Sequence, residues 1–367
     1  MAAVRPSEKG RILGNWFLED PLGEGGFGAV YAAHHLAIPE RRAAVKLLHP
    51  ELARQPELRR RFLNEANAAS RADHEHIVQI FDGGETAEGL CFVAMELLRG
   101  SSLTRALEPG PMVPKRVVHI GNQVASALAA AHRVGIVHRD LKPDNIFLIS
   151  RDEQTDFVKV LDFGVAKLIE DERLTKTGHI LGTPAYMAPE QWRCVQDLDG
   201  RADLYSLGII LFRAVTGRMP FHGRTVFEWM EAHLNSSIPD PSNFVSLPRA
   251  LSDLIVLLLS KERELRPSSA AEVRERLAHC LETTIKASHS HPALLPPPKL
   301  DGLANAVVAT GSADPPQNQA GALAFSPSPK GTGTNHDSSA AKHTSHSVLL
   351  SLQDISLVSK QDRKSVV

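Results

Sequence analysis

The sequence is poor in cysteine, with only Cys91, Cys194 and Cys280 among its 367 residues. These three lie far apart and form no C-x-x-C pair, so we expect neither a disulfide framework nor a structural zinc site. The N-terminal stretch MAAVRPSEKGR has no apolar core, so the sequence predicts no secretory signal. Together these features predict a cytoplasmic protein with reduced thiols.

The sequence also lacks an excess of charge of one sign and lacks long apolar runs. The formal net charge is −1, so no global electric field attracts nucleic acid or an anionic membrane. The longest strongly apolar runs, such as LIVLLL at 254–259, are far shorter than the roughly 20 residues of a membrane helix. We therefore expect no nucleic-acid partner and no membrane segment.

Aromatic residues are scarce near the C-terminal end of the chain. From about residue 285 the sequence is rich in Pro, Ser, Gly and Ala, with PPP at 296–298 and SPSP at 326–329. Such a composition buries too little apolar surface to offset the entropy of ordering the chain. The sequence therefore predicts a mostly disordered tail over 285–367. The stretch 348–358 is either a frayed end or a short amphipathic helix that docks on a partner.

Upstream of this tail, two kinds of secondary structure follow one another. Segment 12–98 is typical of strands, with ILGNWFLEDPL, FGAVYAAHH, AAVKLL and LCFVAMELL, and carries one helix from about Pro56 to Arg71. Segment 99–284 is typical of helices, such as VVHIGNQVASALAAAHRVG and LYSLGIILFRAVTG. A small β-rich unit followed by a larger helical unit predicts an α+β protein with two lobes and a cleft between them.

A glycine-rich stretch, LGEGGFGAV at 22–30, contains Gly23, Gly25 and Gly28 in the spacing G-x-G-x-x-G. Glycines allow sharp turns and a close approach of the backbone to phosphate groups. A dinucleotide-binding turn would need a helix directly after the glycines. Here AVYAAHH follows, and then another strand, which favours a β-hairpin over a strand–helix turn.

Lys46 lies in AAVKLL, an otherwise apolar strand. In the next helix Leu58, Phe62, Glu65 and Ala69 recur on one face, so Glu65 is a carboxylate in an apolar stripe. A buried carboxylate needs a partner, and Lys46 is the natural candidate. On these features alone, a functional Lys46–Glu65 pair and a purely structural one are equally good interpretations.

The stretch HRDLKPDN at 138–145 places Asp140, Lys142 and Asn145 close together, and Asp162 follows in DFG. Apolar runs on both sides, before 138 and at 146–149, predict a polar turn held between buried elements. This is how a site is usually presented to its ligand.

Taken in order, the motifs GEGGFGAV, AAVK, Glu65, HRDLKPDN, DFG and GTPAYMAPE resemble those of the protein kinase family. The resemblance is to the bacterial serine/threonine kinases of eukaryotic (Hanks) type and covers about residues 12–284. It implies a small antiparallel β lobe with one main helix at 12–98 and a larger, mainly helical lobe at 99–284. Residues 1–11 would be an N-terminal extension.

The resemblance implies an enzyme that transfers the γ-phosphate of ATP to Ser and Thr hydroxyls of protein substrates. Its cofactors would be ATP and Mg²⁺, with Mn²⁺ as an alternative metal. Catalysis of phosphoryl transfer rests mostly on positioning and charge neutralisation. The family roles are Asp140 as proton acceptor, Lys142 at the γ-phosphate, Lys46 at the α- and β-phosphates with Glu65 orienting it, and Asn145 and Asp162 as metal ligands.

The resemblance also assigns a nucleotide site. Glu96 and Leu98 would bind adenine through their backbone, Met95 would close the pocket behind it, Val30 and Ala44 would form its roof, and Phe147 its floor. The full set of implied nucleotide contacts is Leu22, Gly23, Glu24, Gly25, Gly26, Phe27, Gly28, Val30, Ala44, Lys46, Met95, Glu96, Leu98 and Phe147.

Two further contacts and one departure follow from the resemblance. Glu190 of APE is expected to pair with Arg266, and Asp203 is expected to anchor the catalytic loop. Asn145 and Asp162 are separated by a few residues more than is usual in the family. We expect this insertion to enlarge a β-hairpin away from the metal site and to leave activity intact.

The segment between DFG and APE carries Thr175, Thr177 and Thr183. Thr183 lies in GTPAY, where the resemblance gives it a role at the substrate site. The pair in LTKT resembles the phosphorylated threonines of bacterial relatives, and Arg139 is the cation that such a phosphate would neutralise. We therefore expect autophosphorylation on Thr175 and Thr177, as part of a signalling role. The alternative is two solvated threonines in a mobile loop.

Two other functions compete with an active protein kinase. A pseudokinase would be marked by loss of Lys46, Asp140 or Asp162, and all three are present. A small-molecule kinase would be expected to lack GTPAYMAPE, which is also present. Both alternatives are therefore less favoured than a serine/threonine protein kinase.

Overall fold

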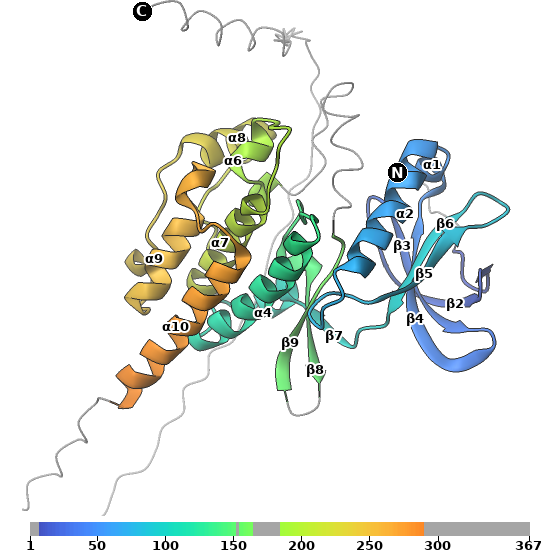
Figure 1. Cartoon of the computed structure of the whole chain (residues 1–367), viewed down its shortest axis with the longest axis horizontal. Coiled ribbons are helices and arrows are strands. Elements are labelled where there is room, and N and C mark those ends of the chain that lie inside the picture. Colours follow the sequence, from blue (N-terminus) through green and yellow to red (C-terminus); the bar gives the residue numbers. More distant parts are fainter. Residues whose placement is uncertain (1–6, 152–153, 164–183, 290–367) are drawn as a thin grey trace, which may run out of the picture. The chain divides into compact units, whose positions relative to one another are not determined.

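A computed structural model describes residues 7–151, 154–163 and 184–289 of the chain. Strands of this part form two antiparallel sheets, one ordered β1-β2-β3-β4-β6-β5 and one ordered β7-β8-β9 (Figure 1). The strands are β1 (Ile12–Leu13), β2 (Trp16–Glu24), β3 (Gly28–His35), β4 (Ile38–Leu48), β5 (Ile80–Glu85), β6 (Cys91–Glu96), β7 (Gly100–Ser102), β8 (Ile146–Arg151) and β9 (Gln154–Val160).

Apart from α2, the helices up to α3 have four residues each, and from α4 onward all described helices except α6 are longer. They are α1 (Pro50–Ala53), α2 (Pro56–Arg71), α3 (Leu103–Ala106), α4 (Pro114–Arg133), α6 (Pro189–Trp192), α7 (Arg201–Thr216), α8 (Val226–Asn235), α9 (Arg249–Leu258) and α10 (Ala270–His289). Within the described ranges the chain also forms four 3₁₀ turns, at Pro143–Asn145, Pro184–Tyr186, Pro241–Asn243 and Arg263–Leu265.

The larger sheet carries apolar side chains on both faces, because successive residues of a strand point to opposite sides. One face buries a cluster that includes Trp16, Tyr31 and Val45. The other face packs against α1 and α2, in a cluster that joins Val93 of β6 to Phe62 of α2 (Figure 1). Burying a side chain such as Phe62 contributes about 1.5–3 kcal/mol. These two clusters fix the register of the strands that present the site residues.

Helix α2 has the bounds that its sequence pattern predicts. Pro56 stands at its first turn, where a missing amide hydrogen costs nothing, and Arg71 stands in its last turn, near the negative end of the helix dipole. Leu58, Phe62 and Ala69 of the predicted inward stripe are all buried. The inward face of α2 is therefore confirmed.

Helix α7 lies at the centre of the second part of the chain, with α4 and α9 packed against it. Almost all of its side chains are buried, which is typical of a helix that is apolar all round. It ends at Gly217, whose φ of 70° lies in the left-handed region that glycine adopts without strain. Helix α10 packs along α4 and closes this core (Figure 1).

Some elements differ from those predicted. Strand β5 and the short helix α1 are additional to the predicted elements. The disordered tail was expected to begin at residue 285, but α10 continues to His289. The predicted segment 348–358 lies outside the described residues. Within the described ranges, no helix is both long enough and apolar enough to cross a membrane.

Candidate active site

The glycine-rich stretch forms the turn between β2 and β3. The Gly25 amide donates a hydrogen bond to the Gly28 carbonyl oxygen (2.9 Å), and Gly23 pairs with Val30 across the two strands. A Cβ atom on Gly28 would lie 2.0 Å from the Leu47 carbonyl oxygen, so only glycine lets β3 run this close to β4. Because a strand follows the glycines, the turn is a β-hairpin and not a strand–helix turn.

His49, directly after β4, contacts this turn from a buried position. Its Nε2 donates a hydrogen bond to the Gly25 carbonyl oxygen (2.8 Å), and its backbone amide donates one to the Phe27 carbonyl oxygen (2.9 Å). No motif or spacing in the sequence singles out His49. The contacts arise because β4 ends beside the glycine-rich turn.

The side chains predicted to surround adenine come from neighbouring strands. Val30 lies opposite Lys46 in the β3–β4 pair, and Ala44 lies opposite Met95 in the β4–β6 pair. Residues directly opposite each other in an antiparallel pair point to the same face of the sheet. Lys46 and Ala44 are two residues apart on β4, so all four share one face.

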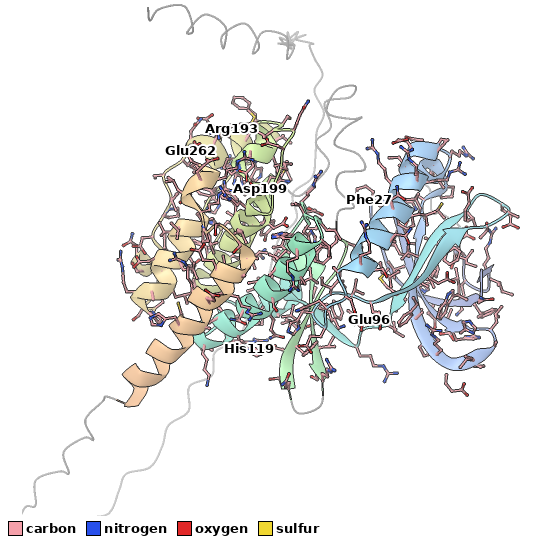
Figure 2. All side chains as sticks on the ribbon, in the orientation of Figure 1. Phe27, Glu96, His119, Arg193, Asp199 and Glu262 are labelled. Carbon is pink, nitrogen blue, oxygen red and sulfur yellow. The ribbon has the colours of Figure 1, made fainter. Side chains whose placement is uncertain are left out.

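The remaining predicted nucleotide contacts lie at the ends of strands. Leu22 and Glu24 are exposed near the end of β2, and Glu96 ends β6 (Figure 2). Leu98 follows β6 and is half-buried. Phe147 lies on β8 of the smaller sheet, opposite Ser102, and is also half-buried.

Lys46 and Asp162, far apart in the sequence, form an ion pair with 2.6 Å between Nζ and Oδ1. Burial alone would raise the pKa of the Asp162 carboxyl, but the Lys46 ammonium outweighs it and lowers that pKa. The φ angle of Asp162 is 54°, a conformation that few non-glycine residues adopt. The predicted Lys46–Glu65 pair stays a prediction, because the Glu65 side chain lies outside the described part of the structure.

A cavity of about 40 Å³ lies beside this ion pair. Both members of the pair line it, together with apolar side chains from α2, β5 and β6 and the stretches beside β5 and β9. Met95, which was expected to close a pocket behind the nucleotide, forms part of its wall. The apolar lining residues are Phe62, Ala66, Ala69, Val78, Ile80, Val93, Met95 and Phe163.

The loop 138–145 brings three polar side chains together. Lys142 Nζ donates to Asp140 Oδ2 at 2.7 Å. Asn145 Nδ2 donates to the backbone carbonyl oxygen of Asp140 at 2.9 Å, which leaves the Asn145 Oδ1 as the atom available to a cation. Oxygen ligands of this kind suit small hard cations such as Mg²⁺.

The buried carboxylate of Asp203 holds the backbone of the same loop in place. Asp203 Oδ1 accepts a hydrogen bond from the Arg139 backbone amide, and Oδ2 accepts from the His138 amide and from His132 Nε2, each at 2.8 Å. Burial alone would raise the pKa of Asp203, but the hydrogen bonds and electrostatic interactions with His132 and His138 outweigh burial and lower it. The expectation that Asp203 anchors the catalytic loop is confirmed.

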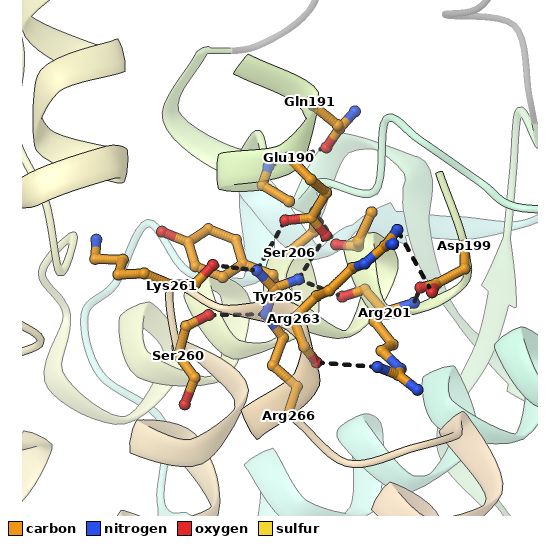
Figure 3. A network of polar contacts seen from close by, with 12 residues as sticks. Glu190, Gln191, Asp199, Arg201, Tyr205, Ser206, Ser260, Lys261, Arg263 and Arg266 are labelled. Atoms are coloured by element: carbon orange, nitrogen blue, oxygen red, sulfur yellow. Dashed lines mark hydrogen bonds and ion pairs between the residues drawn. The ribbon is translucent and has the colours of Figure 1, made fainter. Parts of the chain in front are cut away.

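A second buried ion pair holds the segment after residue 184. Arg266 donates through Nη1 and Nη2 to the two oxygens of Glu190, at 2.6 and 2.8 Å (Figure 3). Carbonyl oxygens of Arg201, Ser260 and Lys261 accept the other N–H groups of Arg266. The predicted Glu190–Arg266 pair is therefore confirmed. Next to it, Gln191 Nε2 donates to the Arg139 carbonyl oxygen (2.8 Å), which links this segment to the catalytic loop.

These positions and their order agree with a known domain. The sequence model of the protein kinase domain matches residues 16–279. The chain belongs to the protein kinase family. The chain is 44% identical over 277 residues to the serine/threonine-protein kinase Pkn1 of Myxococcus xanthus. This match covers 75% of the chain and 39% of Pkn1. The chain is 38% identical over 275 residues to PknH of Mycobacterium tuberculosis, which covers 74% of this chain and 43% of PknH.

The chain thus spans less than half the length of these two curated relatives. Among solved structures, the kinase is similar to the PknI kinase domain of Mycobacterium tuberculosis, with a TM-score of 0.59 and 27% identity. That comparison covers 76% of this chain and all of the PknI domain. The predicted α+β kinase fold, with an antiparallel β lobe and a helical lobe, is confirmed.

Proposed function

We propose that this chain is a serine/threonine protein kinase, which transfers the γ-phosphate of ATP to hydroxyl groups of protein substrates. The arrangement of charged side chains in the site carries the proposal. The loop with Asp140, Lys142 and Asn145 is fixed through Asp203, and the Lys46–Asp162 ion pair supplies the charges that phosphoryl transfer needs. The names of the curated relatives support the choice of serine and threonine over tyrosine.

Each site residue has a proposed role. Asp140 accepts the proton of the substrate hydroxyl, and Lys142, which already contacts that carboxylate, neutralises charge on the γ-phosphate. Lys46 binds the α- and β-phosphates. Asn145 and Asp162 would hold Mg²⁺, or Mn²⁺ in its place, through their side-chain oxygens. When bound, the metal neutralises the developing charge on the phosphates.

The glycine-rich turn is proposed to cover the ATP phosphates through its backbone. Its residues are Gly23, Glu24, Gly25, Gly26, Phe27 and Gly28, and Leu22 precedes it. The adenine is proposed to lie between Val30 and Ala44 on one side and Phe147 on the other, with backbone contacts from Glu96 and Leu98. The shared strand face of Val30, Ala44 and Met95 supports this assignment.

We further propose a kinase domain over 12–284, continued to His289 by α10, an N-terminal extension at 1–11, and a mostly disordered tail in which 348–358 is either a frayed end or a short helix that docks on a partner. A signalling role and activation by autophosphorylation on Thr175 and Thr177 belong to the same proposal. These two threonines lie outside the described residues. The cytoplasmic location expected from the sequence stays a prediction.

The test of the proposed function is the Asp140→Asn variant. It should still bind Mg-ATP, because the loop anchor and the Lys46–Asp162 pair are untouched. Phosphate transfer to a generic acceptor such as myelin basic protein should fall about 10²- to 10⁴-fold, because the proton acceptor is lost. Radiolabelled ATP gives the rate, and calorimetry gives the nucleotide affinity.

Asp144→Asn is the matched control. Asp144 lies in the same loop but is exposed, so its loss should leave the rate within about threefold. Near-normal turnover of the Asp140→Asn protein, with contaminating kinases excluded by purification, would overturn the assignment of Asp140. Wild-type protein that binds ATP but phosphorylates no protein would instead favour a pseudokinase.

A further inference from the structure

Lys159 is a lysine in an interior position of the kinase. It lies on β9 between Val158 and Val160, and its residue is only 9% exposed. A lysine that is removed from water in this way needs acceptors for its ammonium group. Neither the proposed catalytic roles nor the nucleotide contacts above make use of it.

The ammonium of Lys159 binds two segments from outside its own sheet. Its Nζ donates to Glu96 Oε1 at 2.6 Å and contacts the Ile77 carbonyl oxygen at 3.4 Å. The same Glu96 oxygen also accepts the Gln79 backbone amide at 2.8 Å, and the Glu96 amide donates to the Gln79 carbonyl oxygen at 2.9 Å. Glu96 is therefore held by its carboxylate and by its backbone amide.

This arrangement leaves Glu96 little freedom at the point where β6 ends (Figure 2). One carboxylate oxygen, Oε1, binds both Lys159 and Gln79, so the carboxylate is held on that side and the backbone of Glu96 is left to meet adenine. Lys159 also stands three residues before Asp162 on the same stretch of chain. The Lys159 ammonium thus connects Glu96, expected beside the adenine, to strand β9, which leads to Asp162, the proposed metal ligand.

We propose that Lys159 is a positioning residue for the adenine of ATP and acts through the carboxylate of Glu96. The inference rests on the proposed ATP site. Without the ammonium, Glu96 loses its charged partner and the backbone from Glu96 to Leu98 can move relative to β9. Adenine affinity should then fall, while Asp140 and Lys142, held separately by Asp203, should keep their geometry.

The test is Lys159→Met, which keeps the length of the side chain but removes its charge. We expect the KM for ATP to rise about tenfold and kcat at saturating ATP to change less than threefold. The Kd for ADP, measured by calorimetry without any protein substrate, should rise by the same factor. Lys159→Arg should restore both constants to within about threefold of the wild type, because a guanidinium can also bind the Glu96 carboxylate.

Arg116→Met is the matched control, because Arg116 anchors the same strand at its other end. Its Nε and Nη2 donate to the two oxygens of Asp156, each at 2.8 Å, and join α4 to β9. If Lys159 merely held β9 in place, loss of either cation would weaken ADP binding equally. We expect Arg116→Met to leave both the KM for ATP and the Kd for ADP unchanged.

Glu96→Gln completes the test and applies even if Lys159→Met fails to fold. It should raise the Kd for ADP as the lysine variant does, and the double variant should be no worse than either single one. An unchanged Kd for ADP in Lys159→Met or in Glu96→Gln would overturn the proposal, and so would an equal rise in Arg116→Met. Because ADP binding needs no phosphate transfer, a wild-type protein that binds ADP but lacks kinase activity would refute only the proposed function.

Discussion

At the scale of single residues, the described part of the chain holds buried ionisable side chains in two ways, by pairing them with an opposite charge or by keeping them neutral. Glu190 and Arg266 are paired through two hydrogen bonds, and Asp203 accepts three. His233 on α8 is the opposite case. It is fully buried among aromatic rings, and its Nδ1 lies 2.9 Å from the Tyr205 hydroxyl. The rings around it are Trp192, Tyr205, Phe221 and Trp229.

Burial, assisted by the nearby positive charge of Lys261, lowers the pKa of His233 to about 3. In the unfolded chain the pKa would be about 6.5, so between these values the unfolded state binds one proton more. The contribution of neutral His233 to the free energy of unfolding is therefore complete above about pH 6.5 and is lost as the pH falls from there towards 3. This single group should lower the free energy of unfolding by about 1.4 kcal/mol per pH unit in that window.

The check compares wild type with His233→Phe at pH 7.5 and pH 5.0, by urea unfolding. From pH 7.5 to pH 5.0 the wild type should lose about 2 kcal/mol more unfolding free energy than the variant. Loss of the Tyr205 hydrogen bond affects the variant at both pH values and cancels in this comparison. Equal losses in the two proteins would show that His233 does not stay neutral in the folded state.

At the scale of elements, the catalytic loop and the segment after residue 184 are joined near Arg139. Gln191 binds the Arg139 carbonyl oxygen, and Asp203 binds its amide. Among the described residues, no carboxylate lies within ion-pair distance of the Arg139 guanidinium. The φ angle of Arg139 is 66°, a conformation that L-residues adopt only where the surrounding structure imposes it. The guanidinium is thus available to an anion that the described segments do not supply.

We predict that this anion is a phosphate on Thr175 or Thr177. A phosphate adds roughly −1.5 to −2 charges and several acceptors, enough to bind Arg139 and to order the segment. Active wild-type protein should therefore carry phosphate on one or both threonines, and Asp140→Asn protein should carry none. Thr175→Ala/Thr177→Ala should lose about tenfold or more of the activity while keeping ATP affinity. Mass spectrometry and kinase assays on the same preparations give both results.

A fully active preparation with neither threonine modified would refute this activation mechanism. Arg139→Ala provides a second check on it. If the phosphate acts through Arg139, the variant should be as weak as the double threonine variant. Combining the changes should then cause little further loss.

At the scale of the whole molecule, the described domain ends with α10. This helix buries Val273, Leu277 and Cys280 in the same apolar cluster as α4 and α7. Beyond His289 the sequence has few aromatic and strand-forming residues. We therefore predict that the chain cut after His289 folds cooperatively and phosphorylates a generic acceptor at a rate within about threefold of the full chain.

Thermal unfolding and the rate of phosphate transfer measure this outcome. A chain cut after Ser269 is the control, because it removes α10 and exposes the faces of α4 and α9 that α10 covers. It should not fold. If the version ending at His289 is inactive or unfolded, some part of 290–367, with 348–358 as the first candidate, docks on the kinase domain.

Elements of the fold could be predicted where a local sequence pattern reveals which residues are buried. The inward stripe of α2 and the apolar run of α7 are visible in the sequence because burial repeats with the helical period. Strand β5 is not visible in this way. Its sequence, IFDGGE, has two glycines and two acids and weak strand preference, and it is a strand because it pairs with β6.

In the candidate site, too, some features follow from the sequence and others only from the tertiary structure. By itself the sequence determined the family and the chemistry of the site, because glycines, carboxylates and lysines in ordered motifs constrain what a short loop can do. The motifs also predicted the Glu190–Arg266 pair, but only the tertiary structure decided three other pairs that join distant segments: Lys46 with Asp162, Lys159 with Glu96, and His49 with the Gly25 carbonyl. Such pairs depend on strand register and on where elements end, and these are set by packing of the whole core and leave no local pattern.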